Sequence, residues 1–198
     1  MRRAIYGGSF NPIHHDHIKL ALQFSQQFEL DRVTLIPTYI TPLKDNTKIA
    51  DGKHRYQMCL LATQDYPQLE VSDIELRRKG ESYTSDTIRE LLNDDDSLYL
   101  IVGADMYMTL DRWHDARYIF DHVTILVAPR DELDYDSLEE KYLEYKEKYD
   151  CRTLIAHQQI GALSSTLIRE GISSGADVSG MVDPRVLEYI QKHDLYRE

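Results

Sequence analysis

Two groups of polar residues, far apart in the chain, have the types and the spacing that phosphate chemistry requires. The first group is the run GGSFNPIHHDH near the start of the sequence. Gly7 and Gly8 have no side chain, so positive φ is open to them and a phosphate can approach their backbone closely. A helix that begins near Pro12–Asp16 would add free N–H groups and the positive end of its dipole. His14 and His17, which share one helical face, could donate hydrogen bonds to phosphate oxygens or neutralise charge that develops during phosphoryl transfer.

The second group is the run SSTLIR, in which Ser164, Ser165 and Thr166 are expected to open another short helix. Hydroxyls and free N–H groups at a helix start form an anion cradle. Arg169 lies one turn further on, where its guanidinium could fork onto phosphate oxygens. Each group alone also fits an ordinary interpretation: a tight turn, surface histidines, or a capped helix with a surface arginine. The combination of the two groups indicates a nucleotide site.

Other chemistries fit these residues less well. A zinc site formed by His14, His15 and His17 stays open as an alternative, but no carboxylate-bearing helix supplies the remaining ligands. Cys59 and Cys151 lack a C-x-x-C spacing, which argues against a disulfide scaffold and fits a reducing compartment. The sequence contains no G-x-x-x-x-G-K-[ST] loop, so a P-loop enzyme is excluded.

Alternating apolar segments predict the elements that must position these residues. Strands are expected at Arg2–Tyr6, Val33–Ile36, Leu69–Val71, Leu98–Val102 and Val123–Val127. Helices are expected at His17–Phe28, Ala50–Thr63, Ser85–Asn93, Ser137–Tyr149, Ser165–Glu170 and Pro184–His193. This alternation predicts an α/β fold with a Rossmann-like, doubly wound, mostly parallel sheet and helices on both faces. Ligands of such sheets bind beyond the carboxyl ends of the strands, near the point where the strand order reverses.

Length and composition limit the choice of partners. The 198 residues predict one domain over 1–198, in which 163–198 form a C-terminal helical part that carries SSTLIR. A net charge of −11 argues against a protein of duplex nucleic acid or anionic membranes, but not against one nucleotide in a locally basic cleft. No apolar run approaches the ~18 residues of a membrane span, and MRRAIYGGSF reaches its glycine pair before a signal peptide could form. A cytoplasmic protein is therefore expected.

The segment Thr38–Gly52 is interpreted as a mobile loop over the site.

The first polar run resembles the signature of the nucleotidyltransferase superfamily with the H-x-G-H motif. It is most similar to the nicotinate-nucleotide adenylyltransferase family, whose members read like G-G-T/S-F-D/N-P-I-H-x-G-H. The matching positions are Gly7, Gly8, Ser9, Phe10, Asn11, Pro12, Ile13, His14 and His17.

Asp16 departs from this pattern, because the family usually has Gly there. Its carboxylate should repel incoming phosphates unless it turns outward, caps the helix or meets Mg²⁺. If it faces the phosphates, Asp16→Gly is expected to tighten ATP binding, most strongly at low salt.

The resemblance covers residues 3–196. SSTLIR resembles the family's I-S-S-T-x-I-R, with Leu163 in place of the Ile. Further matching segments are Pro37 with Thr41–Lys44 (P-P-H-K, with Leu43 for His), Ser82–Thr87 (S-Y-T-x-D-T), Gly103–Asp105 with Leu110 and Trp113 (G-A-D-x-x-x-x-L-x-x-W), and the closing stretch 182–196.

The resemblance implies an adenylyltransferase of NAD biosynthesis. ATP and nicotinate mononucleotide would give the deamido dinucleotide and pyrophosphate, by direct in-line attack and without a covalent intermediate. The attacking phosphate is already anionic at neutral pH, so positioning two polyanions and offsetting their repulsion is what the chemistry needs. The implied cofactor is Mg²⁺, held mainly by the substrate phosphates rather than by protein ligands.

The resemblance also assigns residues to roles. The implied catalytic residues are His14, His17 and Arg169. The implied ATP-binding residues are Gly7, Gly8, Ser9, Phe10, His14, His17, Gly103, Asp105, Ser164, Ser165, Thr166 and Arg169. The implied nicotinate-nucleotide residues are Lys44, Tyr83, Thr84, Asp105 and Trp113, with Arg130 as a further phosphate or base contact. Trp113 would stack on the pyridine ring. It is the only tryptophan of the sequence, and without the resemblance it could equally be a core or hinge residue.

Three alternatives stay open at this point. Another adenylyl- or cytidylyltransferase, for example one acting on pantetheine phosphate, should lack the Ser82–Thr87 and Trp113 features. A class I aminoacyl-tRNA synthetase fragment shares the two histidines but should be longer and less acidic. A pyridine-nucleotide sensor without turnover is kept open by Asp16. The sequence does not give the oligomeric state.

Overall fold

A single parallel sheet forms the centre of the molecule. The computed structural model describes residues 1–42, 49–93, 97–129, 132–156, 161 and 163–197. Within these residues the strands are β1 (Arg2–Gly8), β2 (Arg32–Pro37), β3 (Leu69–Val71), β4 (Ser97–Gly103), β5 (Thr124–Ala128) and β6 (Arg152–Ile155). They are ordered β3-β2-β1-β4-β5-β6, and each neighbouring pair is parallel. This order confirms the Rossmann-like fold, with its reversal point between β1 and β4.

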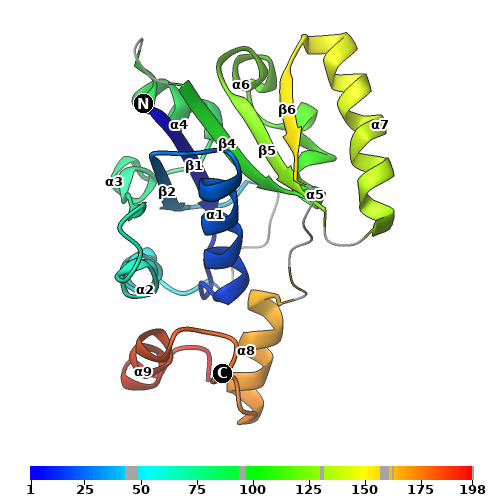
Figure 1. Ribbon diagram of the computed structural model, residues 1–198. Helices are drawn as coiled ribbons and strands as arrows, with labels where there is room; N and C mark the ends of the chain where they lie inside the picture. Colours follow the sequence, from blue (N-terminus) through cyan, green and yellow to red (C-terminus); the bar gives the residue numbers. More distant parts are fainter. Residues whose placement is uncertain (43–48, 94–96, 130–131, 157–160, 162, 198) are drawn as a thin grey trace.

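Helices lie on both faces of this sheet (Figure 1). They are α1 (His15–Gln27), α2 (Gly52–Thr63), α3 (Ile74–Arg78), α4 (Thr84–Leu91), α5 (Ala104–Tyr107), the 3-10 helix η1 (Leu110–Arg112), α6 (Ala116–His122), α7 (Glu132–Tyr149), α8 (Ser165–Ser174) and α9 (Pro184–Lys192). The sequence pattern missed β6, α3, α5, η1 and α6, because segments this short contain too few repeats of a period to be recognised. No helix in the described part of the chain is long and apolar enough to cross a bilayer.

Alternate residues of the strands contribute to two hydrophobic clusters, one on each face of the sheet. In β1, Ala4 and Tyr6 belong to one cluster and Ile5 to the other, as the period of two requires. The cluster that contains α1 also includes Ile168 of α8 and Ile190 of α9. The helices that follow β6 are therefore packed into the same core as the helix that follows β1.

The end of β1 differs from the prediction. The strand does not stop at Tyr6 but continues through both glycines, with Gly7 opposite Ile36 of β2. Parallel pairing keeps the glycines extended, and the positive φ in this turn, 44°, belongs to Phe10. The expectation that the glycines supply positive φ is therefore wrong. A Cβ on Gly8 would lie 3.1 Å from the Phe10 ring, which explains the need for glycine there.

All the strands point the same way, so the loops that follow them gather at one edge of the sheet. Figure 1 shows α8 and α9 beyond this edge, below the start of α1. Both polar groups found in the sequence follow strands, one after β1 and one after β6. Of the predicted mobile loop Thr38–Gly52, residues 43–48 lie outside the described part.

Candidate functional site

Two histidines lie side by side at the start of α1. The ring centroids of His14 and His17 are 3.7 Å apart, with 31° between the ring planes. His14 is only 6% exposed, and His17 is half-buried. The backbone N–H of His14 donates a hydrogen bond of 3.2 Å to Nδ1 of His17. A neutral imidazole that accepts at Nδ1 carries its proton on Nε2, so His17 presents Nε2–H as a donor.

Both imidazoles are neutral at pH 7. Burial lowers the pKa of His14 to about 4, against the opposing effect of the Asp16 carboxylate. Burial also lowers the pKa of His17 well below its usual value, and the neighbouring His14 lowers it further. The apolar surroundings include the Phe10 ring, whose centroid lies 5.1 Å from that of His17. Of the two roles expected for these residues, hydrogen-bond donation and charge neutralisation, the lowered pKa values favour the first before substrate binds.

The lowered pKa of His14 predicts a loss of stability in mild acid. Its pKa is about 4 in the folded state and 6.5 when unperturbed, so between these values the unfolded chain binds the extra proton. Stability that is complete above pH 6.5 is therefore lost as the pH falls towards 4. At about 1.4 kcal/mol per pH unit, His14 lowers the unfolding free energy by up to about 2 kcal/mol between pH 6.5 and 5. Urea unfolding at both pH values measures this, and a His14→Gln variant with an equally steep decline contradicts it.

The start of α8 is fastened to the loop after β1. Ser164 is the N-cap, and its Oγ accepts the N–H of Leu167 at 3.1 Å. Ser165 is not left open towards a ligand, because its Oγ donates to the carbonyl oxygen of Pro12 at 2.8 Å. The hydrogen bond from Ser165 to Pro12 therefore joins the two polar groups of the sequence.

Asn11 is the point at which several distant segments meet. Arg169 donates from Nη1 to the carbonyl oxygen of Asn11 at 2.8 Å, and from Nη2 to Oγ1 of Thr166 at 3.2 Å. The side-chain Oδ1 of Asn11 accepts from the N–H of Ala50 at 3.0 Å and from the hydroxyl of Tyr196 at 2.8 Å. Arg169, which sequence reasoning aimed at phosphates, also holds the first loop in place.

Asp16 does not point into open solvent. Its Oδ2 accepts the N–H of Leu163 at 2.8 Å, in the segment that leads into α8. The carboxylate is thus directed at the second polar group.

A buried arginine that sequence reasoning missed holds the loops after β1 and β2 together. Arg55 is 1% exposed, and its guanidinium donates to three carbonyl oxygens: Ala50 at 2.8 Å, Ser9 at 2.7 Å and Thr38 at 2.6 Å. The signal was available in the sequence, because Arg55 lies three residues before Met58, on the inward stripe of its predicted helix.

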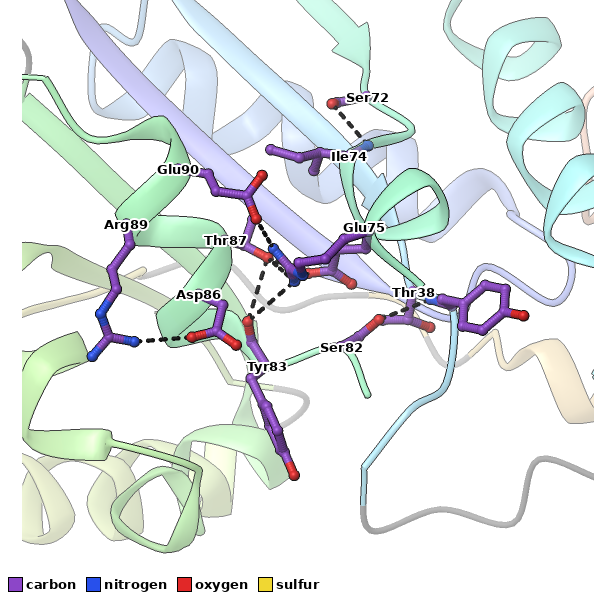
Figure 2. Close-up of polar contacts among 12 residues, drawn as sticks. Thr38, Ser72, Ile74, Glu75, Ser82, Tyr83, Asp86, Thr87, Arg89 and Glu90 are labelled. Carbon is purple, nitrogen blue, oxygen red and sulfur yellow. Dashed lines mark hydrogen bonds and ion pairs between the residues drawn. The ribbon is translucent and has the colours of Figure 1, made fainter. Parts of the chain in front are cut away.

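The residues predicted to read the pyridine lie around the start of α4. Tyr83 precedes α4 and stacks on His114 with ring centroids 4.1 Å apart and 25° between the planes. Figure 2 shows the Tyr83 ring projecting away from α4. Thr84 is the first residue of this helix and is half-buried. Trp113, which ends η1, is half-buried against the hydrophobic cluster on this face, next in the chain to His114. His114 was missed, because a single exposed histidine carries no pattern.

A network of polar side chains between α3 and α4 stabilises the turn that precedes α4. Thr87 donates from its hydroxyl to Glu75 at 2.7 Å, and Arg78 donates to Thr87 at 2.9 Å and to Glu90 at 2.5 Å (Figure 2). Glu75 is 4% exposed, and burial raises its pKa. On the N-terminal side of the turn, the Oγ of Ser82 accepts a hydrogen bond of 2.8 Å from the backbone N–H of Tyr39. The turn before α4 is therefore fixed from two directions.

The remaining predicted site residues are spread around the same edge. Gly103 ends β4 at the reversal point and Asp105 is exposed in α5. Phe10 is 1% exposed, so only its backbone could reach a nucleotide. Lys44 and Arg130 lie outside the described residues. Among the residues that are described, no group of three or more His, Cys, Asp or Glu could hold a metal ion.

Comparisons with known proteins agree on one group of relatives. The family described as Cytidylyltransferase-like matches residues 5–171. The chain is 32% identical over 194 residues to the "Probable nicotinate-nucleotide adenylyltransferase" of Lachnoclostridium phytofermentans, covering 97% of each chain. It is 36% identical to the protein of the same name from Enterococcus faecalis, over 98% of this chain and 84% of the other. The structure entitled "Plasmodium falciparum nicotinic acid mononucleotide adenylyltransferase complexed with NaAD" shares the fold, with a TM-score of 0.77, 17% identity, and coverage of 98% of this chain and 97% of that one.

Proposed function

This chain belongs to the nicotinate-nucleotide adenylyltransferase family, and we propose that it transfers AMP from ATP to nicotinate mononucleotide. The products are deamido-NAD and pyrophosphate. One observation carries the proposal: the helix start that holds His14 and His17 is joined directly to the helix start of SSTLIR, through the bond from Ser165 to Pro12. Two converging helix N-termini suit a triphosphate, because each offers free N–H groups and a positive dipole end.

The reaction is an in-line displacement at the α-phosphorus of ATP. An oxygen of the mononucleotide phosphate forms the new P–O bond, the bond from the α-phosphorus to the bridging oxygen breaks, and pyrophosphate leaves with that electron pair. No general base is needed, because the attacking phosphate is already an anion. Nε2–H of His17 donates to the oxygens on which charge develops, and His14, the α8 N-terminus and Arg169 help to orient the triphosphate.

Magnesium belongs to the substrate side of this proposal. Mg²⁺ typically retains several waters and binds substrate phosphates with one or two carboxylates. The described residues offer no cluster of ligands for it. We propose that Mg²⁺ arrives on the triphosphate, and we assign no step to a metal held by the protein.

The turn before α4 supports a preference for nicotinate over nicotinamide. Nicotinate carries a carboxylate, for which N–H groups at the start of α4 and the hydroxyl of Thr84 are suitable donors. An amide would need an acceptor for its NH₂. Glu81, the only carboxylate in Gly80–Ser85, already accepts the hydroxyl of Tyr83. Trp113, Tyr83 and His114 offer aromatic surface for the pyridine ring, but stacking does not distinguish an acid from an amide.

We expect kcat/KM for nicotinate mononucleotide to exceed that for nicotinamide mononucleotide by at least about tenfold, or about 1.4 kcal/mol. The same experiment tests the function: pyrophosphate release is measured with Mg-ATP and a panel of acceptors that includes both mononucleotides and pantetheine phosphate. Release with pantetheine phosphate alone favours the other superfamily activity. ATP binding without release favours a sensor. Equal values for the two mononucleotides contradict the role given to the turn before α4.

The wider context follows from the same proposal. We propose a single nucleotidyltransferase domain over residues 1–198, with 163–198 as the C-terminal helical part, acting in the cytoplasm on ATP and nicotinate mononucleotide without nucleic acid or membrane. The acidic net charge of −11 supports the exclusion of both polyanionic partners. Lys44 and Arg130 remain proposed contacts of the mononucleotide.

A further inference from the structure

The carboxylate of Asp16 connects two segments that are 147 residues apart in the chain. Asp16 lies in the first turn of α1, between the two histidines, where a negative charge also suits the helix dipole. Its Oδ2 accepts the N–H of Leu163 at 2.8 Å. Leu163 directly precedes Ser164, the N-cap of α8. The position of this one amide therefore helps to set where α8 begins.

Gly161 is fitted to the same carboxylate. A Cβ at this position would lie 2.5 Å from both Oδ1 and Oδ2 of Asp16, closer than Cβ atoms and oxygens approach one another. Its φ lies outside the positive region, so the backbone conformation itself would accept alanine. The three atoms nearest to this Cβ all belong to the Asp16 carboxyl group. The absence of a side chain at Gly161 thus leaves the space that the Asp16 carboxylate occupies.

We propose that Asp16 is a positioning residue for ATP: its contacts with Gly161 and Leu163 hold the start of α8 so that it faces the start of α1 at the separation a triphosphate needs. This inference rests on the proposed function. A second fastening, from Ser165 to Pro12, lies on the other side of Ser164. With both in place, the N-cap of α8 is held on each side. In this proposal the Asp16 carboxylate is engaged by the Leu163 N–H and helps to build the phosphate site instead of repelling its ligand.

Two properties of Asp16, its hydrogen-bond acceptor and its charge, can be separated by substitution. Asp16→Asn keeps an oxygen that can accept the Leu163 N–H but removes the charge, whereas Asp16→Ala removes both. If the acceptor matters, the asparagine variant keeps ATP affinity and the alanine variant loses it. If repulsion of phosphates by the charge dominates, both variants bind ATP more tightly than the unaltered protein.

The test measures kcat and both KM values for Asp16→Ala, Asp16→Asn, Gly161→Ala and the double variant with alanine at both positions. We expect Asp16→Ala to raise KM for Mg-ATP about tenfold, equivalent to about 1.4 kcal/mol, and to leave KM for nicotinate mononucleotide within about twofold. Gly161→Ala should behave like Asp16→Ala, because its methyl group displaces the carboxylate. The double variant should be no worse than either single variant, since one contact is lost in all three. Effects that add in the double variant, or an unchanged or lower KM for Mg-ATP in Asp16→Ala, overturn the proposal.

A second readout does not depend on turnover. Hydrogen exchange of the Leu163 amide, measured without ATP, should be faster in Asp16→Ala and Gly161→Ala, and close to that of the unaltered protein in Asp16→Asn. If the unaltered protein releases no pyrophosphate, the proposed function fails while the exchange pattern still reports on the contact. If turnover is normal and exchange is the same in all variants, the positioning role fails and the function stands.

Discussion

Replacing His17 with alanine should lower kcat by about 10²–10³, the usual loss when one preorganised donor to developing negative charge is removed. The donor is well fixed, because the His14 N–H bound to Nδ1 of His17 holds the ring and leaves the proton on Nε2. The imidazole is already neutral, so the donor needs no proton from solvent at neutral pH. Steady-state pyrophosphate release with saturating substrates measures the loss, and thermal unfolding shows whether the variant remains folded.

His15→Ala is the matched control for this experiment. His15 lies two residues before His17 on the same helical turn, and its side chain is exposed. Its contact with Met181 is made by the backbone N–H, which the substitution keeps. Its kcat should stay within about twofold of the unaltered value, as expected of a surface change. Full activity in His17→Ala would remove this residue from the site.

Replacing Arg55 with methionine should lower the unfolding free energy by about 3 kcal/mol. Methionine keeps much of the apolar volume but leaves the carbonyl oxygens of Ser9, Thr38 and Ala50 without their donor. Each bond to a charged donor contributes roughly 1 kcal/mol or more after desolvation of the guanidinium is offset. Urea unfolding monitored by circular dichroism gives the value directly.

Lys53→Met tests whether this effect belongs to the site of substitution. Lys53 lies two residues earlier on α2, and its side chain is exposed. Its unfolding free energy should change by less than about 0.5 kcal/mol, as for most surface substitutions. Equal losses in the two variants would mean that the loss cannot be assigned to the three carbonyl bonds of Arg55.

Local patterns explain why so much of the fold could be predicted from the sequence. β2 and β5 are continuous apolar segments bounded by charged residues or proline, and they stand in the structure within one residue of their predicted limits. α4 and α9 begin within one residue of where their helices are predicted to begin. The two polar groups were recognisable because each is confined to a few neighbouring positions. Information of this kind is contained in the sequence itself.

What the sequence could not provide depends on contacts between distant residues. The neutral state of His14 follows from burial, which exists only in the folded chain. The turn of Asp16 towards Leu163 and the stacking of Tyr83 on His114 join segments with no shared pattern. Arg55 was overlooked for a different reason: a charged residue on an inward stripe is usually read as an interruption of the stripe, not as part of the core.

The contacts of Asn11 bear on the order in which this molecule folds. Its partners lie 39, 158 and 185 positions away, so the chain must close loops of very different lengths before this one residue is satisfied. Closing a longer loop is entropically more expensive, and such contacts tend to form after local ones. The pairing of β1 with β2, in which Arg3 lies opposite Arg32, closes a shorter loop than any of these contacts and is expected to precede them. We expect the contacts of Asn11 with Arg169 and Tyr196 to be the last of these to form, and a ligand that binds at this loop would stabilise them.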